Sequence, residues 1–165
     1  MSTCFFKGTF GATFKTTVQK LLATVLITLL PLACSKAGEG APGSAQLSST
    51  APAAASVYLI SPVNGERVPT TFKVKFGLSG MGVAPAGVPS NNTGHHHLLI
   101  DIEQLPPLDK PLPASDKLRH FGGGQTEVLL TLEPGEHSLQ LLLGNHLHVP
   151  HQPPVLSKKI HITVE

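Results

Sequence analysis

Apolar residues occupy every second position in several short segments of this chain. Within residues 71–78 the apolar side chains run from Phe72 to Leu78, and two lysines stand between them. A period of two predicts a β-strand with one buried face. Six such segments are predicted: residues 57–60, 71–78, 95–102, 125–132, 138–143 and 159–164. No helical period follows the first apolar run of the chain, so the sequence predicts an all-β fold.

Connections rich in Pro and Gly separate the predicted strands. Short strands joined in this way are typical of an antiparallel β-sandwich, and we expect an immunoglobulin-like sandwich of about six to seven strands over residues 57–165. This length is enough for one core and one domain. The connections 79–94 and 104–124 are long for such a fold. Long structured loops often carry function.

The N-terminal part has a different composition. Three lysines precede an apolar run, residues 21–32, which is shorter than the ~20 residues that span a bilayer and matches a signal peptide. Ala33 and Cys34 end the run as in a bacterial lipobox. We therefore predict a lipoprotein-type signal segment, residues 1–33, and a lipid on Cys34 that anchors the protein to a membrane. A plain secreted form and an uncleaved anchor are the alternatives.

The predicted anchor implies the bacterial cell envelope. By resemblance to sorted lipoproteins, Ser35 favours the periplasmic face of the outer membrane. Residues 34–56 are rich in Ala, Ser, Gly and Pro and are predicted to be a flexible tether.

Charge and cysteine content exclude several classes of function. The chain has 12 Lys+Arg and 10 Asp+Glu, and without the three lysines of the signal segment the balance is 9 minus 10, or −1. A nearly neutral domain has no field for phosphate backbones, so we expect no nucleic-acid partner. Cys4 lies in the signal segment and Cys34 would carry lipid. No thiol is then left for a disulfide, a zinc-thiolate site or a nucleophile.

Nine histidines carry the candidate chemistry, because imidazole is the commonest metal-binding side chain. Residues two apart on a strand share a face, so His95 and His97 form a pair of ligands. His120 ends a long connection and precedes three glycines. If residues 145–149 are extended, His146 and His148 form a second pair, and Pro150 turns His151 back. The predicted metal ligands are His95, His97, His120, His148 and His151, for copper(II) or zinc.

Other polar residues are given structural roles or two alternatives. His137 is interpreted as a capped core or rim residue, and His161 as solvated surface. His96 shares the face of Leu98 and is either buried with a hydrogen bond or directed into a cavity. Asp101 either faces solvent or orients an imidazole ring from outside the ligand set.

Four stretches resemble the domain of unknown function 4399 family. They are KFGLSGMGVAPAG at residues 75–87, NTGHHHLLID at 92–101, HFGGGQTE at 120–127 and HVPH at 148–151. The resemblance implies a small exported bacterial domain, often a lipoprotein, and supports the domain limits and the three places where histidines gather. It implies no activity. This chain differs in having His146 close to His148.

Three classes of function follow from the sequence. The leading hypothesis is a lipid-tethered domain that binds copper(II) or zinc. The alternative is a non-metal module that holds a cell-envelope protein or glycan through hydrogen bonds. A metal-dependent enzyme would also need a general base. Glu103 and Glu127 are candidates for that base, but nothing in the sequence favours either, and no catalytic residue is predicted.

Overall fold

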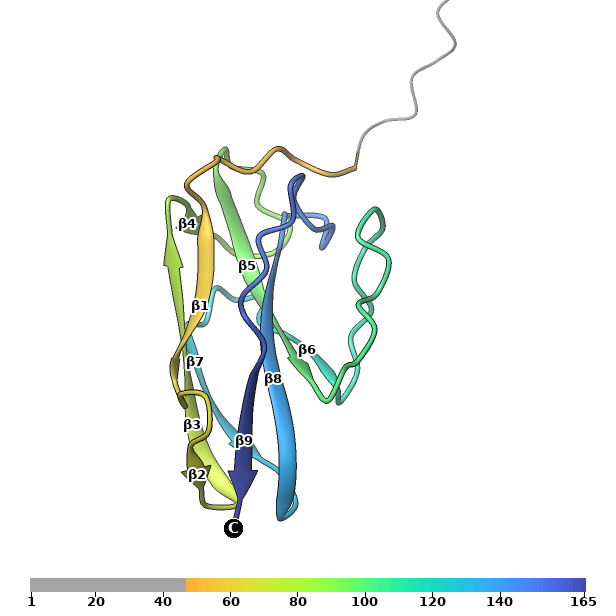
Figure 1. Cartoon of the computed structure of the whole chain (residues 1–165). Helices are drawn as coiled ribbons and strands as arrows, with labels where there is room; N and C mark the ends of the chain where they lie inside the picture. The colour runs from red at the N-terminus through yellow and green to blue at the C-terminus, as the bar shows by residue number, and fades with distance from the viewer. Residues whose placement is uncertain (1–46) are drawn as a thin grey trace, which may run out of the picture. The chain divides into compact units, whose positions relative to one another are not determined.

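A computed structural model describes residues 47–165 as two β-sheets packed face to face (Figure 1). None of these residues is helical, so the prediction of an all-β sandwich is confirmed. The described part has nine strands: β1 (Ser56–Ser61), β2 (Arg67–Val68), β3 (Thr71–Ser79), β4 (Gly82–Val83), β5 (Thr93–Ile100), β6 (Leu118–His120), β7 (Glu127–Thr131), β8 (Gly135–Gly144) and β9 (Ile160–Val164).

The two sheets differ in size and in strand direction. The smaller sheet is antiparallel in the order β1-β3-β7, and the larger has the order β2-β9-β8-β5-β4, with β6 also paired to β5. Two pairs in the larger sheet, β2 with β9 and β4 with β5, are parallel. This sheet is therefore mixed, whereas the sequence predicted antiparallel pairing throughout. The six predicted segments correspond to the longer strands, and β2, β4 and β6 lie in the connections between them.

Alternate residues of both sheets fill the space between them. Phe72, Val74 and Phe76 of β3 pack in one buried cluster with residues of β5 and β8. Such alternation is expected when each sheet turns one face to a common core. The strand periods read from the sequence place these residues correctly.

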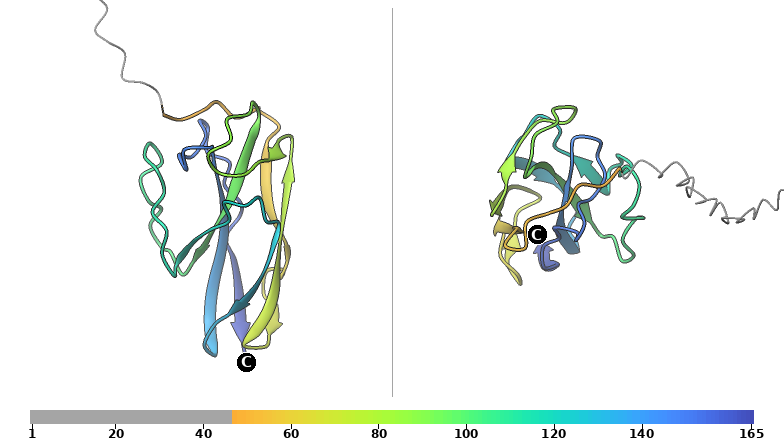
Figure 2. Two further views of the ribbon diagram at one scale, coloured as in Figure 1. Left: turned by 180° about the vertical axis from the view of Figure 1, so that it is seen from behind. Right: turned by 90° about the horizontal axis from the view of Figure 1, so that it is seen from above.

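A second apolar cluster lies on the other face of the larger sheet. Leu99 of β5 and Leu142 of β8 pack there with Leu112 and Leu118, which come from the connection between β5 and β6 and from β6 itself. Figure 1 and Figure 2 show this connection beside the larger sheet. Because it covers the outer face, seven of the eight residues of β5 are buried. The sequence predicted one buried face for this strand, whereas both of its faces are buried.

The described end of the predicted tether lies on the domain. Thr50 forms an isolated β-bridge with Gln152. The Ala51 amide donates to the Gln152 carbonyl, and the Gln152 amide donates to the Ser49 carbonyl. Ala51 is 5% exposed and belongs to the core between the sheets. The sequence placed these residues in a flexible tether, but a small apolar side chain and two backbone hydrogen bonds fix them here.

The predicted signal segment 1–33, lipidation at Cys34 and tether residues 34–46 lie outside the described residues. Within residues 47–165 there is no helix that is long and apolar enough to cross a membrane.

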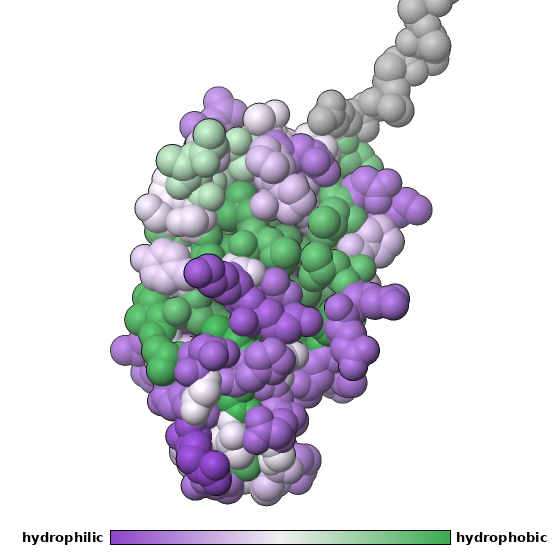
Figure 3. Space-filling model, viewed as in Figure 1, coloured by the Kyte–Doolittle hydropathy of each residue, from purple (hydrophilic) through white to green (hydrophobic). Residues whose placement is uncertain are grey.

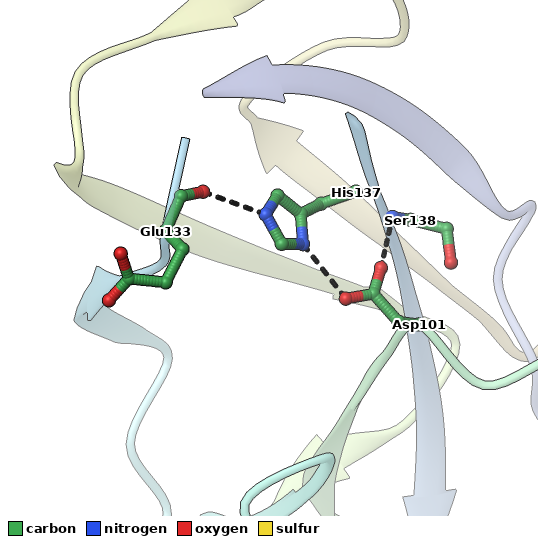
Figure 4. A network of polar contacts seen from close by, with 4 residues as sticks. All are labelled: Asp101, Glu133, His137 and Ser138. Carbon is green, nitrogen blue, oxygen red and sulfur yellow. Dashed lines mark hydrogen bonds and ion pairs between the residues drawn. The ribbon is translucent and has the colours of Figure 1, made fainter. Parts of the chain in front are cut away.

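The strand ends are held by polar contacts that involve Asp101 (Figure 4). Its carboxylate bonds the His137 Nδ1 at 2.8 Å and accepts the Ser138 amide at 2.8 Å, while the second ring nitrogen of His137 bonds the Glu133 carbonyl at 2.9 Å. Burial is the largest single influence and lowers the pKa of His137. The contacts with Asp101 and Glu133 together outweigh it, so the pKa of His137 is raised. His137 is thus a structural rim histidine, as predicted, and Asp101 is occupied with it.

One side of the sandwich exposes apolar residues, seen in green across the middle and upper part of Figure 3. A groove of about 410 Å³ lies there between β1 and the segment that leads into β9. Its apolar lining comes from Val57, Leu59, Leu156 and Ile160. The lower part of the same view is mostly polar.

Candidate metal centre

His95 and His97 lie on the outer face of the larger sheet, on its most enclosed strand. β5 pairs with β8 along most of its length, and His95 and His97 stand opposite Gly144 and Leu142. Their ring centroids are 4.8 Å apart, as expected for side chains two residues apart on one strand face. Both are almost completely buried, at 0% and 1% exposure.

Strand pairing brings His120 to the same face. β6 is antiparallel to β5, and its last residue, His120, is the direct partner of His97. Directly opposed residues in an antiparallel pair project to one face with their Cβ atoms about 4.5–5.5 Å apart. The His120 ring therefore lies 5.1 Å from that of His97 and 4.9 Å from that of His95, while His120 itself remains exposed.

His148 reaches the cluster from a turn after β8. The His148 amide donates to the Asn145 carbonyl, and the Asn145 amide donates to the Val149 carbonyl. His148 has a φ of 66°, a left-handed conformation that is uncommon outside glycine. Residues 145–149 would have to be extended for His146 and His148 to pair, but these hydrogen bonds close them into a turn. His146 and His148 therefore do not form the pair of ligands that an extended strand would give.

Four imidazole rings thus meet from three separate parts of the chain. The ring of His148 lies 4.7 Å from His120, 5.1 Å from His95 and 6.3 Å from His97. One nitrogen from each of His95, His120 and His148 lies within 4.8 Å of the others, so this group could hold a metal ion. We call His95, His97, His120 and His148 the histidine cluster.

The buried members of the cluster have free ring nitrogens. Within the described part of the chain, no group forms a hydrogen bond with either nitrogen of His95 or of His97. Leaving a buried polar atom without a partner costs about 1–3 kcal/mol, and buried polar groups in proteins almost always have one. Four unpartnered nitrogens next to two further imidazoles form a set of donors that could hold a metal ion.

Burial and crowding keep the rings neutral. Burial, followed by the repulsion of His120 and His148, lowers the pKa of His95 from 6.5 to about 4. Burial, with smaller effects of His95 and His120, brings the pKa of His97 to about 3. The pKa of His120 is also lowered, chiefly by burial. Because metals bind the neutral ring, protons do not compete for these nitrogens near pH 7.

Three glycines provide space for histidine rings. A Cβ on Gly144 would lie 2.7 Å from Cε1 of His97, a Cβ on Gly122 would overlap the His120 ring, and a Cβ on Gly94 would lie 2.9 Å from Nε2 of His151. From the sequence, the glycines after His120 were expected to contribute no more than backbone freedom. The structural role of Gly122 is close approach of the imidazole, because any side chain would occupy the position of the ring.

Replacing Gly122 is expected to weaken metal binding without unfolding the domain. In Gly122→Ala the new methyl must displace the exposed His120 ring, so we expect about a ten-fold loss of zinc affinity and little change in melting temperature. Competition titration with a zinc chelator measures the affinity. Gly123→Ala is the matched control, because its Cβ meets the Gln125 side chain at 2.9 Å and no cluster histidine. Equal affinity of both variants and wild type would contradict this role of Gly122.

The remaining histidines lie outside the histidine cluster, although His151 is close enough to His95 to contribute to lowering the pKa of His95. His151, a predicted ligand, is outside the group of three: its Nδ1 bonds the Ser49 hydroxyl at 2.8 Å, and with His146 it lines a separate cavity of about 580 Å³. His96 is fully buried on the inner face, 5.2 Å from the Phe76 ring, and its nitrogens have no hydrogen-bond partner among residues 47–165. Its predicted face is confirmed. His161 is exposed, as expected.

Sequence reasoning missed Asn145, which organises the turn that carries His148. Its side-chain oxygen accepts the Leu147 amide at 2.8 Å and the Val149 amide at 3.1 Å. An asparagine four residues before Val149 is a recognisable signal for such a turn, since Asn side chains often bond backbone amides two to four residues ahead.

The fold and the site define a class: a β-sandwich with a histidine cluster that could hold a metal ion. The chain belongs to the family described as Domain of unknown function (DUF4399), whose model matches residues 74–165. The matched part contains the whole histidine cluster and begins within β3. No curated protein and no solved structure matches the chain significantly.

Proposed function

We propose that this protein is an exported, lipid-anchored domain that binds one divalent transition metal ion, copper(II) or zinc, in the histidine cluster. The observation that carries the proposal is the convergence of His95, His120 and His148 to within 4.8 Å, beside the unpartnered nitrogens of His97. Tetrahedral coordination at 2.0–2.1 Å separates ligand nitrogens by about 3.4 Å, so the rings need to draw together only slightly.

Two of the four histidines are fixed and the other two can move toward an ion. His95 and His97 are fixed on a strand that is paired on both sides. His120 is exposed at the end of the three-residue β6 and His148 is partly exposed, so the rings of these two residues supply the movement. The exposed side of His120 also gives an ion a route from solvent.

The ligand chemistry selects the metal. Imidazole nitrogen suits zinc and copper(II), whereas calcium and magnesium take oxygen ligands. Copper(I) favours soft sulfur ligands, and residues 47–165 contain no cysteine and a single methionine, Met81. His97 is proposed as the fourth ligand, because its ring lies next to those of His95 and His120.

Titration of the metal-free protein tests the proposal. Purified without an affinity tag, the full chain is expected to bind one equivalent of zinc or of copper(II), measured by competition with a chromophoric chelator and by metal analysis after gel filtration. The copper(II) spectrum is expected to show nitrogen ligands only. Binding of less than a tenth of an equivalent at micromolar free metal would overturn the proposed function.

Anchoring at Cys34 is a separate part of the proposal and is supported by the sequence before Ser35. Growth with labelled palmitate should label the wild-type protein and leave Cys34→Ser unlabelled. Fractionation of the labelled envelope tests the expected outer-membrane location. Label on both proteins, or on neither, would contradict lipidation at this residue.

A non-metal binding module is the second candidate. The cavity of about 580 Å³ favours it, because the lining of amides, hydroxyls and two imidazoles suits an uncharged polar ligand such as a glycan or a cell-envelope protein loop. Under this alternative, metal removal should leave partner capture unchanged.

Two carboxylates were considered as the general base of a metal-dependent enzyme. Glu127 pairs with Lys73 at 2.9 Å, and Glu103 lines a shallow pocket beside His137.

A further inference from the structure

Asn145 is buried, at 2% exposure, and connects two distant parts of the chain. Its side-chain oxygen accepts two amides of the turn that carries His148, as described above. Its side-chain nitrogen donates to the Leu47 carbonyl at 2.8 Å. All the hydrogen-bonding groups that fix Asn145 thus come either from the turn or from the segment before β1.

That segment, residues 47–51, runs across the end of the larger sheet and is called the strap here. It bonds the turn through Leu47, bonds the His151 ring through the Ser49 hydroxyl, and pairs with Gln152 through its backbone. The Ala51 side chain packs in the core and holds the strap against the domain. Both flanks of the turn are therefore held by residues of the strap.

The turn itself needs this support. The left-handed backbone of His148 is a strained conformation for a residue with a side chain, and it persists only where surrounding contacts fix it. The Leu112 amide also donates to the His148 carbonyl at 3.0 Å, so the covering connection holds the turn from the other side.

We propose that Asn145 is a positioning residue for His148 and that metal binding in the histidine cluster and docking of the strap stabilise each other. This inference rests on the proposed function, and it adds a link between the metal centre and the segment that joins the domain to the N-terminal part of the chain. The coupling is reciprocal by thermodynamic necessity: if a docked strap tightens metal binding, metal must tighten docking by the same factor.

Substitutions on the strap test the coupling away from every ligand. Ala51→Asp places a charge at a buried position and should release the strap. Ala53→Asp is the matched control, because it makes the same change two residues further on at an exposed position. In the full chain we expect about ten-fold weaker zinc binding for Ala51→Asp and wild-type affinity for Ala53→Asp. Thermal melting without metal shows how much stability each variant retains.

Hydrogen exchange measures the reverse effect. Zinc should slow exchange of the Ala51 and Gln152 amides in the wild-type protein by about the factor by which Ala51→Asp weakens zinc binding. The same slowing is expected in Ala53→Asp. Fast strap exchange in Ala51→Asp together with unchanged zinc affinity would overturn the coupling.

A second variant separates positioning from stability. Asn145→Ala should give the copper(II) spectrum of His148→Ala, with one nitrogen ligand fewer, because the freed turn no longer presents His148. His146→Ala, one residue further on, should keep the wild-type spectrum. If Asn145→Ala lowers the melting temperature but keeps the wild-type copper(II) spectrum, Asn145 is structural only and the proposal is wrong.

The outcomes also separate the inference from the proposed function. When wild type and Ala53→Asp bind metal and Ala51→Asp binds it equally well with a released strap, the inference fails and the function stands. When wild type itself binds no metal, the proposed function fails and the coupling fails with it.

Discussion

The metal-free protein is expected to lose most of its stability between pH 6.5 and pH 4. Burial first, with neighbouring imidazoles adding to it for His95 and His97, lowers the pKa of His95 and His96 to about 4 and that of His97 to about 3. In the unfolded chain these rings take up protons below about 6.5, whereas the folded protein holds them neutral. The unfolded state therefore binds more protons in this range, and stability falls as the pH falls.

The size of this effect is large for a small domain. Each such histidine adds about 1.4 kcal/mol per pH unit to the slope of the free energy of unfolding against pH. Three such histidines therefore give a slope of about 4 kcal/mol per pH unit at most. The stability of a domain is about 5–15 kcal/mol in total. Urea unfolding at a series of pH values measures the slope. A free energy of unfolding that is constant from pH 7 to pH 5 would contradict the expectation.

Two variants identify the source of the slope. His96→Leu replaces a ring that lies against Phe76 without a hydrogen bond to any described residue, and it should remove about one third of the slope. His161→Ala changes an exposed histidine and should leave the slope as it is. Added zinc should shift the acid transition to lower pH, because bound metal occupies the nitrogens that would take up protons.

Removal of single ligands should have the largest effect on metal affinity. His120→Ala and His148→Ala each take away one of the three nitrogens that lie within 4.8 Å of one another. Loss of a group that only orients a ligand costs 10–100-fold in metal affinity, so loss of a ligand should cost ~100-fold or more. The double variant should bind no zinc at micromolar concentration in a competition titration.

The position of each residue gives this test its controls. His120 is exposed, so His120→Ala should keep the wild-type melting temperature without metal and lose only the stabilisation that zinc provides. His146→Ala, near His148 but lining the other cavity, should bind zinc as wild type does. His151→Ala should lose less affinity than His120→Ala, because its ring bonds Ser49. Wild-type affinity of His120→Ala would exclude this set of ligands.

Local sequence determined the strands and the direction of their side chains. The alternation from Phe72 to Leu78 placed β3 and its buried face, and the same period set His95 and His97 on one face of β5 and His96 on the other. This works because a strand repeats every two residues whatever lies beside it. The absence of thiols from the domain followed equally from the sequence.

Only tertiary structure decided which histidines meet. The register that puts His120 opposite His97 joins strands separated by a long connection, and no local pattern specifies that pairing. The turn that presents His148 depends on Asn145 and on the Leu47 carbonyl, 98 residues away in the chain. The hydrogen bond of His151 with Ser49 likewise joins residues that are 102 positions apart in the chain. Local periodicity fixes where a side chain points, whereas long-range backbone pairing and burial fix what it points at.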